Sequence, residues 1–223
     1  MKLSQSQIQD IERYLDYHEL KQVDLRVEVL DHMAESIEAA MENGVSYTDA
    51  FNQQKEKWDP ELKSYSSFWL GWTLVGPKLL MKKCLQIEKE IHFKALPVAI
   101  IITASLYFFL NFIDAKLFLG RVNLILGVVF SISIVLFLVV FSKIKKSKIE
   151  STYGYLYKIH IKGFGFSGIW ITFFFMALID DIKQINTITT ILQLFGIAMY
   201  FIVNYMFYKV YKKHIAITTQ KLL

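Results

Sequence analysis

The chain has 223 residues, of which 54% are hydrophobic and 15% aromatic, and its formal net charge is +5. Its single cysteine, Cys84, excludes an internal disulfide. The N-terminal segment lacks the apolar core of a secretory signal peptide, so the first membrane helix is expected to serve as the insertion signal.

Residues 1–63 are expected to form an acidic, cytoplasmic helical head. Residues 1–64 contain 7 Lys or Arg and 14 Asp or Glu, a net charge of −7. Ser4 and Gln7 have the spacing of a capping box, in which each side chain accepts a hydrogen bond from the backbone of the other residue. This pattern predicts that the first helix begins directly after Ser4.

The second helix of the head is expected to carry an apolar face beside an acidic one. Apolar residues recur at spacings of four and three, the rhythm of a helical packing seam: Val23, Val27, Leu30, Ala34, Ile37 and Met41. Carboxylates keep the same rhythm one position later: Asp24, Glu28, Asp31, Glu35, Glu38 and Glu42. We interpret this acidic stripe as a surface that binds a protein partner. The alternative is that basic residues of the other two head helices neutralise it.

Part of the stripe also has the spacing of a metal site. Glu28, Asp31, His32 and Glu35 share one helical sector, as metal ligands do in di-iron helix bundles. Such sites need matching ligands from a second helix, and the head offers no second cluster. We therefore interpret this sector as a solvated face and expect no metal and no cofactor.

The third head helix has clear start and stop signals. Gly44 is expected to end the second helix, and Ser46 with Asp49 is expected to begin the third. We expect the third helix to end near Trp58, because Asp59-Pro60 follows.

Residues 64–94 are expected to form a partly helical juxtamembrane segment on the inner face of a membrane. Trp69 and Trp72 lie in this segment, and tryptophan favours the membrane interface because its ring is apolar while its N–H stays hydrated. Pro97 is then expected in the first turn of the first membrane helix, where proline is tolerated.

The rest of the chain, residues 95–223, is expected to form a four-helix membrane bundle. Its four apolar stretches contain no charged residue: 95–113, 122–141, 163–179 and 188–208. Each is about 17–21 residues long and can therefore cross a hydrocarbon core of about 30 Å. The predicted fold class is all-α.

The basic residues predict the orientation of the bundle. Residues 65–223 contain 18 Lys or Arg and 6 Asp or Glu, a net charge of +12. Most of the basic residues precede the first span, follow the fourth, or lie in the loop 142–162, and such segments stay in the cytoplasm. We expect both termini and this loop to be cytoplasmic in a multi-pass protein of the cell (inner) membrane. Three tyrosines of the loop are expected at the membrane interface: Tyr153, Tyr155 and Tyr157.

The membrane stretches show no pattern that indicates catalysis. They lack ionisable residues, which disfavours ion-coupled transport, and Asn111 and Asn204 are expected to form interhelical hydrogen bonds. Residues 163–168 match the G-x-G-x-x-G string, but they open a membrane helix, so we interpret them as a helix-packing element. Histidines expected to be solvated just cytoplasmic of a span are His92, His160 and His214.

Residues 4–58 resemble the HAAS-type signalling domain of bacterial membrane proteins that accompany PadR-like transcription regulators. The resemblance lies in three segments ahead of a multi-span region: SQSQIQDIERYL, DLRVEVLDHMAESIEAAMENG and VSYTDAFNQQKEKW. The chain departs from the family at Lys57-Trp58-Asp59-Pro60, where many relatives have a Leu-Gly-Asp-Pro type of ending. The resemblance implies a regulatory or signalling role without catalysis.

Together these features predict a membrane regulatory or sensor protein, not an enzyme, whose acidic head binds a cytoplasmic protein. A PadR-like regulator is the partner that the resemblance favours, and the acidic head disfavours direct nucleic-acid binding. The alternative is a membrane subunit or small transporter whose head docks onto another component. An enzyme acting on lipid would need a nucleophile, and none is recognisable. Formation of a homo-oligomer is left open.

Overall fold

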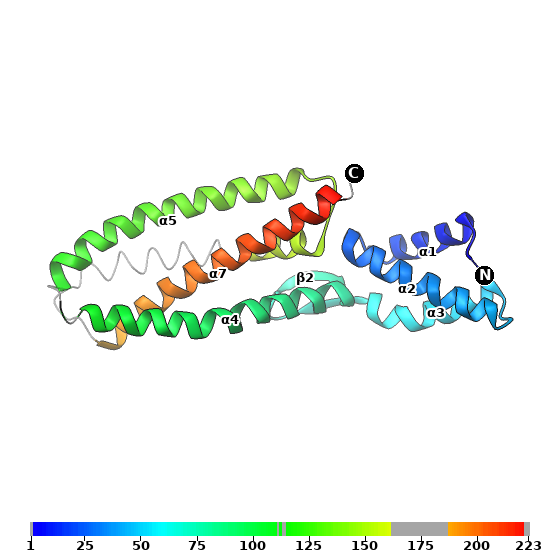
Figure 1. Ribbon diagram of the computed structural model, residues 1–223, viewed down its shortest axis with the longest axis horizontal. Coiled ribbons are helices and arrows are strands. Elements are labelled where there is room, and N and C mark those ends of the chain that lie inside the picture. Colours follow the sequence, from blue (N-terminus) through cyan, green and yellow to red (C-terminus); the bar gives the residue numbers. More distant parts are fainter. Residues whose placement is uncertain (1, 111, 113–114, 162–186, 221–223) are drawn as a thin grey trace. The chain divides into compact units, whose positions relative to one another are not determined.

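The computed structural model describes residues 2–110, 112, 115–161 and 187–220 (Figure 1). The chain divides into two compact units, which are described separately. Unit 1 comprises Met1–Ile87, Lys148–Leu156 and Lys213–Leu223, and unit 2 comprises Glu88–Ser147 and Tyr157–Lys212. The described residues are mostly helical, in agreement with the predicted class, with one two-stranded hairpin as the exception.

The head begins with three helices in unit 1, α1 (Gln5–Tyr17), α2 (Val23–Glu42) and α3 (Tyr47–Leu62), coloured blue to cyan in Figure 1. The predicted capping box is confirmed: Ser4 Oγ accepts from the Gln7 N–H, and Gln7 Oε1 accepts from the Ser4 N–H. Ser46 caps α3 by accepting from the Asp49 N–H at 3.2 Å. Gly44 follows α2 with a φ of +85°, a conformation that glycine adopts without strain.

The core face of α2 differs from the predicted one. The buried residues are spaced by four: Leu25, Val29, Met33 and Ile37. Of the predicted seam only Ile37 is buried, and the Val27 side chain is 39% exposed. α2 carries two neighbouring apolar stripes, and the packing of α2 against α1 and α3 selects the one at the Leu25 position.

The third helix runs four residues further than predicted, to Leu62, with Pro60 inside its last turn. Proline removes only one helical N–H donor here, and the segment is tied to α1 by a hydrogen bond from the Tyr14 hydroxyl to Asp59 Oδ1 at 2.7 Å. Burial, together with the neighbouring Asp59 carboxylate, raises the pKa of Tyr14. Leu62 is buried and fixes the end of the helix in the core.

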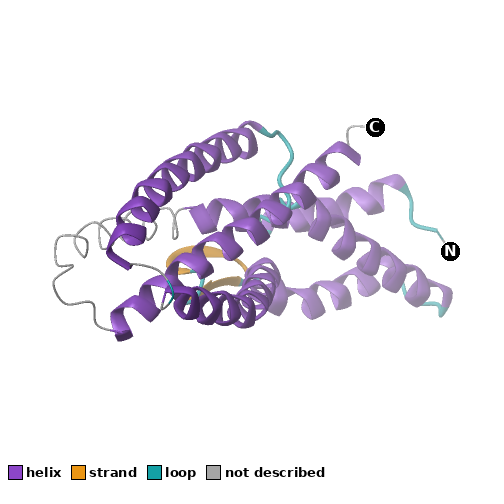
Figure 2. Ribbon diagram, turned by 60° about the vertical axis from the view of Figure 1, so that its left-hand side comes forward, coloured by secondary structure: helices purple, strands orange, loops and turns teal. Residues whose placement is uncertain are grey.

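Residues 64–77 form an antiparallel hairpin, drawn in orange in Figure 2, where a partly helical segment was predicted. Strand β1 (Ser64–Ser67) pairs with β2 (Gly71–Pro77), with Tyr65 opposite Gly76 and a register shift after Ser66. The turn needs the φ of +114° that Gly71 adopts. The Lys78 N–H donates to the Lys63 carbonyl, which closes the base of the hairpin where the next helix begins.

Helix α4 (Lys78–Leu110) starts in unit 1 and continues into unit 2. Its first turns bury Leu80, Met81 and Cys84 in unit 1. The helix therefore begins well before the first predicted span, and Pro97 lies in its interior instead of in its first turn.

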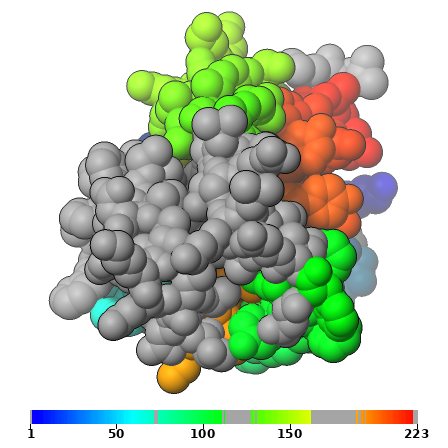
Figure 3. Space-filling view, turned by 90° about the vertical axis from the view of Figure 1, so that its left-hand side faces the viewer, coloured from blue at the N-terminus to red at the C-terminus, as the bar shows by residue number. Residues whose placement is uncertain are grey.

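Unit 2 contains the remainder of α4, helix α5 (Ala115–Lys146) and most of α7 (Thr187–Gln220), whose surfaces appear in green, yellow-green and orange in Figure 3. Residues 152–161 are also helical and pass from unit 1 into unit 2. Among the described residues, Lys78–Leu110 and Leu194–Gln220 are long and apolar enough to cross a membrane. Only 17% and 28% of their apolar stretches are buried, unlike the core helices of a soluble protein.

Of the other two predicted spans, the structure describes one as helix, and the other lies outside the described residues. Residues 122–141 lie inside α5, a single helix of 32 residues. Residues 163–179 lie outside the described residues, as do the G-x-G-x-x-G string at 163–168 and Asn111.

The two valines of α2 provide a test of which face is buried. Val29→Ala should lower the free energy of unfolding of the head by about 2 kcal/mol, because two methyl groups are lost from a closed core. Val27→Ala removes the same atoms from a half-exposed site and should change the free energy of unfolding by less than about 0.5 kcal/mol. Hydrogen exchange of the α2 backbone amides in the full-length protein measures both, and an equal effect would mean that the core face is wrongly assigned.

Candidate functional site

The predicted acidic stripe lies on the outer side of α2. The carboxylates with exposed side chains are Glu28, Asp31, Glu35 and Glu42. The other two are half-buried and are used within the chain: Glu38 accepts from the Leu3 N–H at 2.9 Å, and Asp24 accepts from the Thr152 N–H at 2.8 Å. The stripe thus has an exposed centre, Glu28, Asp31 and Glu35, between two residues with structural roles.

The basic residues of the head do not neutralise this centre. Arg13 pairs with Asp10, and Arg26 pairs with Asp16, so both arginines are matched to carboxylates of α1. Within the residues that the structure describes, Glu28, Asp31 and Glu35 form no ion pair. Close ion pairs from the other head helices therefore do not neutralise the described centre of the stripe.

A second polar arrangement, which sequence reasoning missed, joins the start of α2 to residues 148–156. The Val23 N–H donates to the Glu150 carbonyl at 2.9 Å, and the Thr152 N–H donates to Asp24 Oδ1 at 2.8 Å. Val23 is the first residue of α2, and Thr152 is the first residue of the helix 152–161. Asp24 of α2 thus supplies the acceptor for the first N–H of the helix 152–161, and Glu150, just before that helix, supplies the acceptor for the first N–H of α2. We call this pair of hydrogen bonds the reciprocal cap.

Beside the reciprocal cap, Ser151 holds His214 of α7. Ser151 Oγ lies 2.8 Å from His214 Nδ1 and also accepts from the Gly154 N–H at 3.1 Å, as an N-cap serine does. The His214 side chain is 1% exposed, so the prediction that it is solvated was wrong. A Cβ atom on Gly154 would lie 2.7 Å from His214 Nδ1, which explains why glycine occupies this position.

Only part of this arrangement had a sequence signal. Ser151 directly precedes a helix, and that is the ordinary N-cap signature. Its pairing with His214, and the pairing of Asp24 with Thr152, join residues that lie far apart along the chain, and no local pattern encodes them.

The predicted membrane-interface aromatics have different surroundings in the structure. Trp69, in the hairpin turn, is 73% exposed, whereas the Trp72 side chain lies outside the described part. Lys213 Nζ lies over the Tyr153 ring, 5.1 Å from the ring centre, and Tyr155 is half-buried. Tyr157 is buried. Their position at a membrane interface stays a prediction.

Unit 2 contains a buried polar contact near its predicted cytoplasmic end. His160 is buried instead of solvated, and its ring stacks on Phe207 with the ring centres 3.4 Å apart. His160 Nε2 lies 3.4 Å from Asn204 Oδ1, which is the interhelical hydrogen bond expected for this asparagine. A second polar contact joins α5 to α7, from Ser133 Oγ to the Tyr200 hydroxyl at 2.9 Å.

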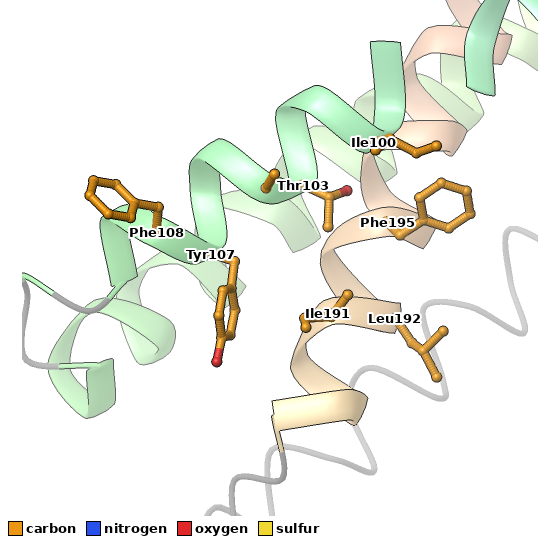
Figure 4. Close-up of a pocket in the computed structure, with 8 residues that line it drawn as sticks. Ile100, Thr103, Tyr107, Phe108, Ile191, Leu192 and Phe195 are labelled. Carbon is orange, nitrogen blue, oxygen red and sulfur yellow. The ribbon is translucent and has the colours of Figure 1, made fainter. Parts of the chain in front are cut away.

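An apolar groove of about 520 Å³ lies between α4 and α7 in unit 2 (Figure 4). The α4 side presents Ile100, Thr103 and Tyr107, and the α7 side presents Ile191 and Phe195. The Thr103 hydroxyl donates to the Ala99 carbonyl of its own helix at 2.7 Å, so it is not directed to a ligand. The groove can offer hydrocarbon contact, and Tyr107 supplies the titratable group of its described lining.

Glu28, Asp31, His32 and Glu35 have the spacing of metal ligands, although the sequence favours a solvated face there. In the parts of the chain that the structure describes, no group of three or more His, Cys, Asp or Glu side chains is placed to hold a metal ion. All four of these side chains are exposed on one helix.

Comparison of the chain with models of protein families, with curated proteins and with solved structures found no match. The resemblance to HAAS-type domains therefore rests on residues 4–58 alone.

Gly154 provides a test of the packing around His214. Gly154→Ala should destabilise unit 1 by about 1–3 kcal/mol, the usual cost of overpacking a closed site, because the buried imidazole would have to move. Gly196→Ala is the control, because among the described residues no atom beyond the adjoining backbone of its own helix and its chain neighbours lies within 4 Å of the added Cβ. The thermal midpoint of the full-length protein in detergent should fall only in the first variant, and an unchanged midpoint would show that His214 can move freely.

Proposed function

We propose that this chain is a multi-pass membrane regulatory or sensor protein whose acidic head binds a basic cytoplasmic protein. The unneutralised centre of the stripe, Glu28, Asp31 and Glu35, carries this proposal. Like charges one helical turn apart destabilise a helix by a few tenths of a kcal/mol for each pair. A cationic partner would relieve that repulsion and would be steered toward the head by its net charge of −7.

A PadR-like regulator is the partner class that the family resemblance favours. A DNA-binding protein presents clustered Lys and Arg to phosphate groups. The same surface is complementary to a row of carboxylates, so binding to the head would compete with binding to DNA. The head itself would make no direct contact with nucleic acid.

The proposed membrane topology has four spans with both termini in the cytoplasm. Two described helical segments are suited to crossing a membrane, and large apolar side chains are exposed along α4, α5 and α7. Soluble monomers rarely expose contiguous apolar surface on this scale. The basic loop 142–162 and the basic C-terminal segment fit the cytoplasmic side.

The competing function is a membrane subunit or small transporter. In that case the bundle would be the working part, and the acidic stripe would only be solvated. The apolar lining of the groove between α4 and α7 does not favour the passage of ions.

The role of the stripe can be tested by removing its central charges. In the variant Glu28→Gln, Asp31→Asn, Glu35→Gln the fold should be retained, because all three side chains are exposed and lack ion pairs in the described structure. Capture of the full-length protein from native membranes should then recover less of a basic cytoplasmic protein. The salt dependence of its retention between about 50 and 300 mM should also become flatter.

The matched control removes the same charge from other parts of the head. Glu12, Glu19 and Glu56 are also exposed, and their joint change to Gln should leave capture nearly unchanged. Equal capture by both triple variants would refute the stripe as the binding surface and would bring the transporter or subunit forward.

The topology can be tested with reporter fusions. Fusions after Lys148 and after Leu223 should report the cytoplasm, and a fusion at Lys183 should report the outside, because the basic segments stay inside. A cytoplasmic signal at Lys183 would contradict four spans.

A further inference from the structure

Helix α2 lacks a cap of its own. Its N-cap residue, Gln22, forms no side-chain hydrogen bond to the first turn, unlike Ser4 before α1 and Ser46 before α3. The first N–H of α2, that of Val23, is instead satisfied by the Glu150 carbonyl. The start of the acidic helix therefore depends on residues 148–156, which follow α5 in the chain.

The other half of the reciprocal cap uses a member of the acidic stripe. Asp24 is followed by Glu28 and Asp31 at spacings of four and three, so the three carboxylates lie on one helical face. Asp24 accepts from Thr152 at the start of a helix, where the helix dipole places partial positive charge. The start of the helix 152–161, with its partial positive charge, therefore already contacts Asp24. Asp24 is one end of the acidic stripe that a basic ligand would cover.

The contact is incompletely satisfied. Gln22 Oε1 and Thr152 Oγ1 are buried and have no hydrogen-bond partner among the described residues. Buried polar atoms without partners cost folding free energy. This part of the contact is therefore held less firmly than a fully bonded one.

We infer that the reciprocal cap and a basic ligand compete for Asp24, so that ligand binding to α2 releases residues 148–156 and closure of the cap weakens ligand binding. This inference rests on the proposed function. Coupling between two binding events is reciprocal, so each event must oppose the other by the same factor. Release of residues 148–156 would also break the hydrogen bond between Ser151 and His214. Ligand binding to α2 would thereby affect the C-terminal part of α7 as well.

Thr152 allows the N–H to be removed without altering the head. Proline is favoured at the first position of a helix, so Thr152→Pro should preserve the helix while removing the donor to Asp24. Thr152→Val is the matched control: it removes the same unpartnered hydroxyl but keeps the N–H. Binding of a fluorescent oligolysine peptide to the full-length protein in lipid nanodiscs should be about fivefold tighter for the proline variant than for the valine variant.

Hydrogen exchange gives a second readout that needs no substitution at residue 152. Oligolysine should speed exchange of the Val23 and Thr152 amides in the unsubstituted protein, because both donate across the contact between α2 and residues 148–156 and lose their acceptors when the segment is released. It should not do so in the variant Glu28→Gln, Asp31→Asn, Glu35→Gln.

The outcomes separate the two proposals. If oligolysine binds the triple variant as tightly as the unsubstituted protein, the acidic stripe is not the binding surface and the proposed function fails. If the triple variant binds weakly but the proline and valine variants bind equally and the two amides stay protected, the stripe stands and the competition for Asp24 is overturned.

Discussion

Backbone N–H groups in the first turn of a helix have no acceptor within that helix, and each must be given one. In unit 1 this requirement organises the contacts among segments that are far apart in sequence. Two head helices solve it locally with Ser4 and Ser46. Helix α2 solves it through Glu150, and in return Asp24 serves the helix that begins at Thr152. Hydrogen bonds at two helix starts thereby connect the head to the loop that follows α5.

The distribution of charge follows from the same packing. Arg13 and Arg26 are used on the α1 side, where they hold Asp10 and Asp16. At the base of the hairpin, hydrogen bonds from Lys78 and Lys82 keep the pKa of the Glu61 carboxyl below its usual range. These basic residues pair with carboxylates elsewhere, and Glu28, Asp31 and Glu35 on the outer face of α2 form no ion pair among the described residues.

The features that could be predicted from the sequence are those set by a few neighbouring residues. The caps at Ser4 and Ser46 and the stop at Gly44 depend on local backbone geometry, and all three were predicted correctly. The core face of α2 was not, because the stripes through Val27 and Val29 are both apolar and only the position of α1 and α3 distinguishes them. The hairpin was missed because its aromatic residues also suit a membrane interface. The partners of Asp24 and His214 lie more than 60 positions away, where no periodic pattern extends.

The burial of Cys84 has a practical consequence for work on this protein. The only thiol of the chain is 0% exposed, on the first turns of α4. Alkylating reagents reach a buried sulfur only when the structure around it opens, so its labelling rate in the native protein reports local opening of unit 1. Cysteines introduced at exposed positions would be labelled much faster. Probes can therefore be attached to introduced cysteines without replacing Cys84. Slow labelling of Cys84 then shows that unit 1 is still folded.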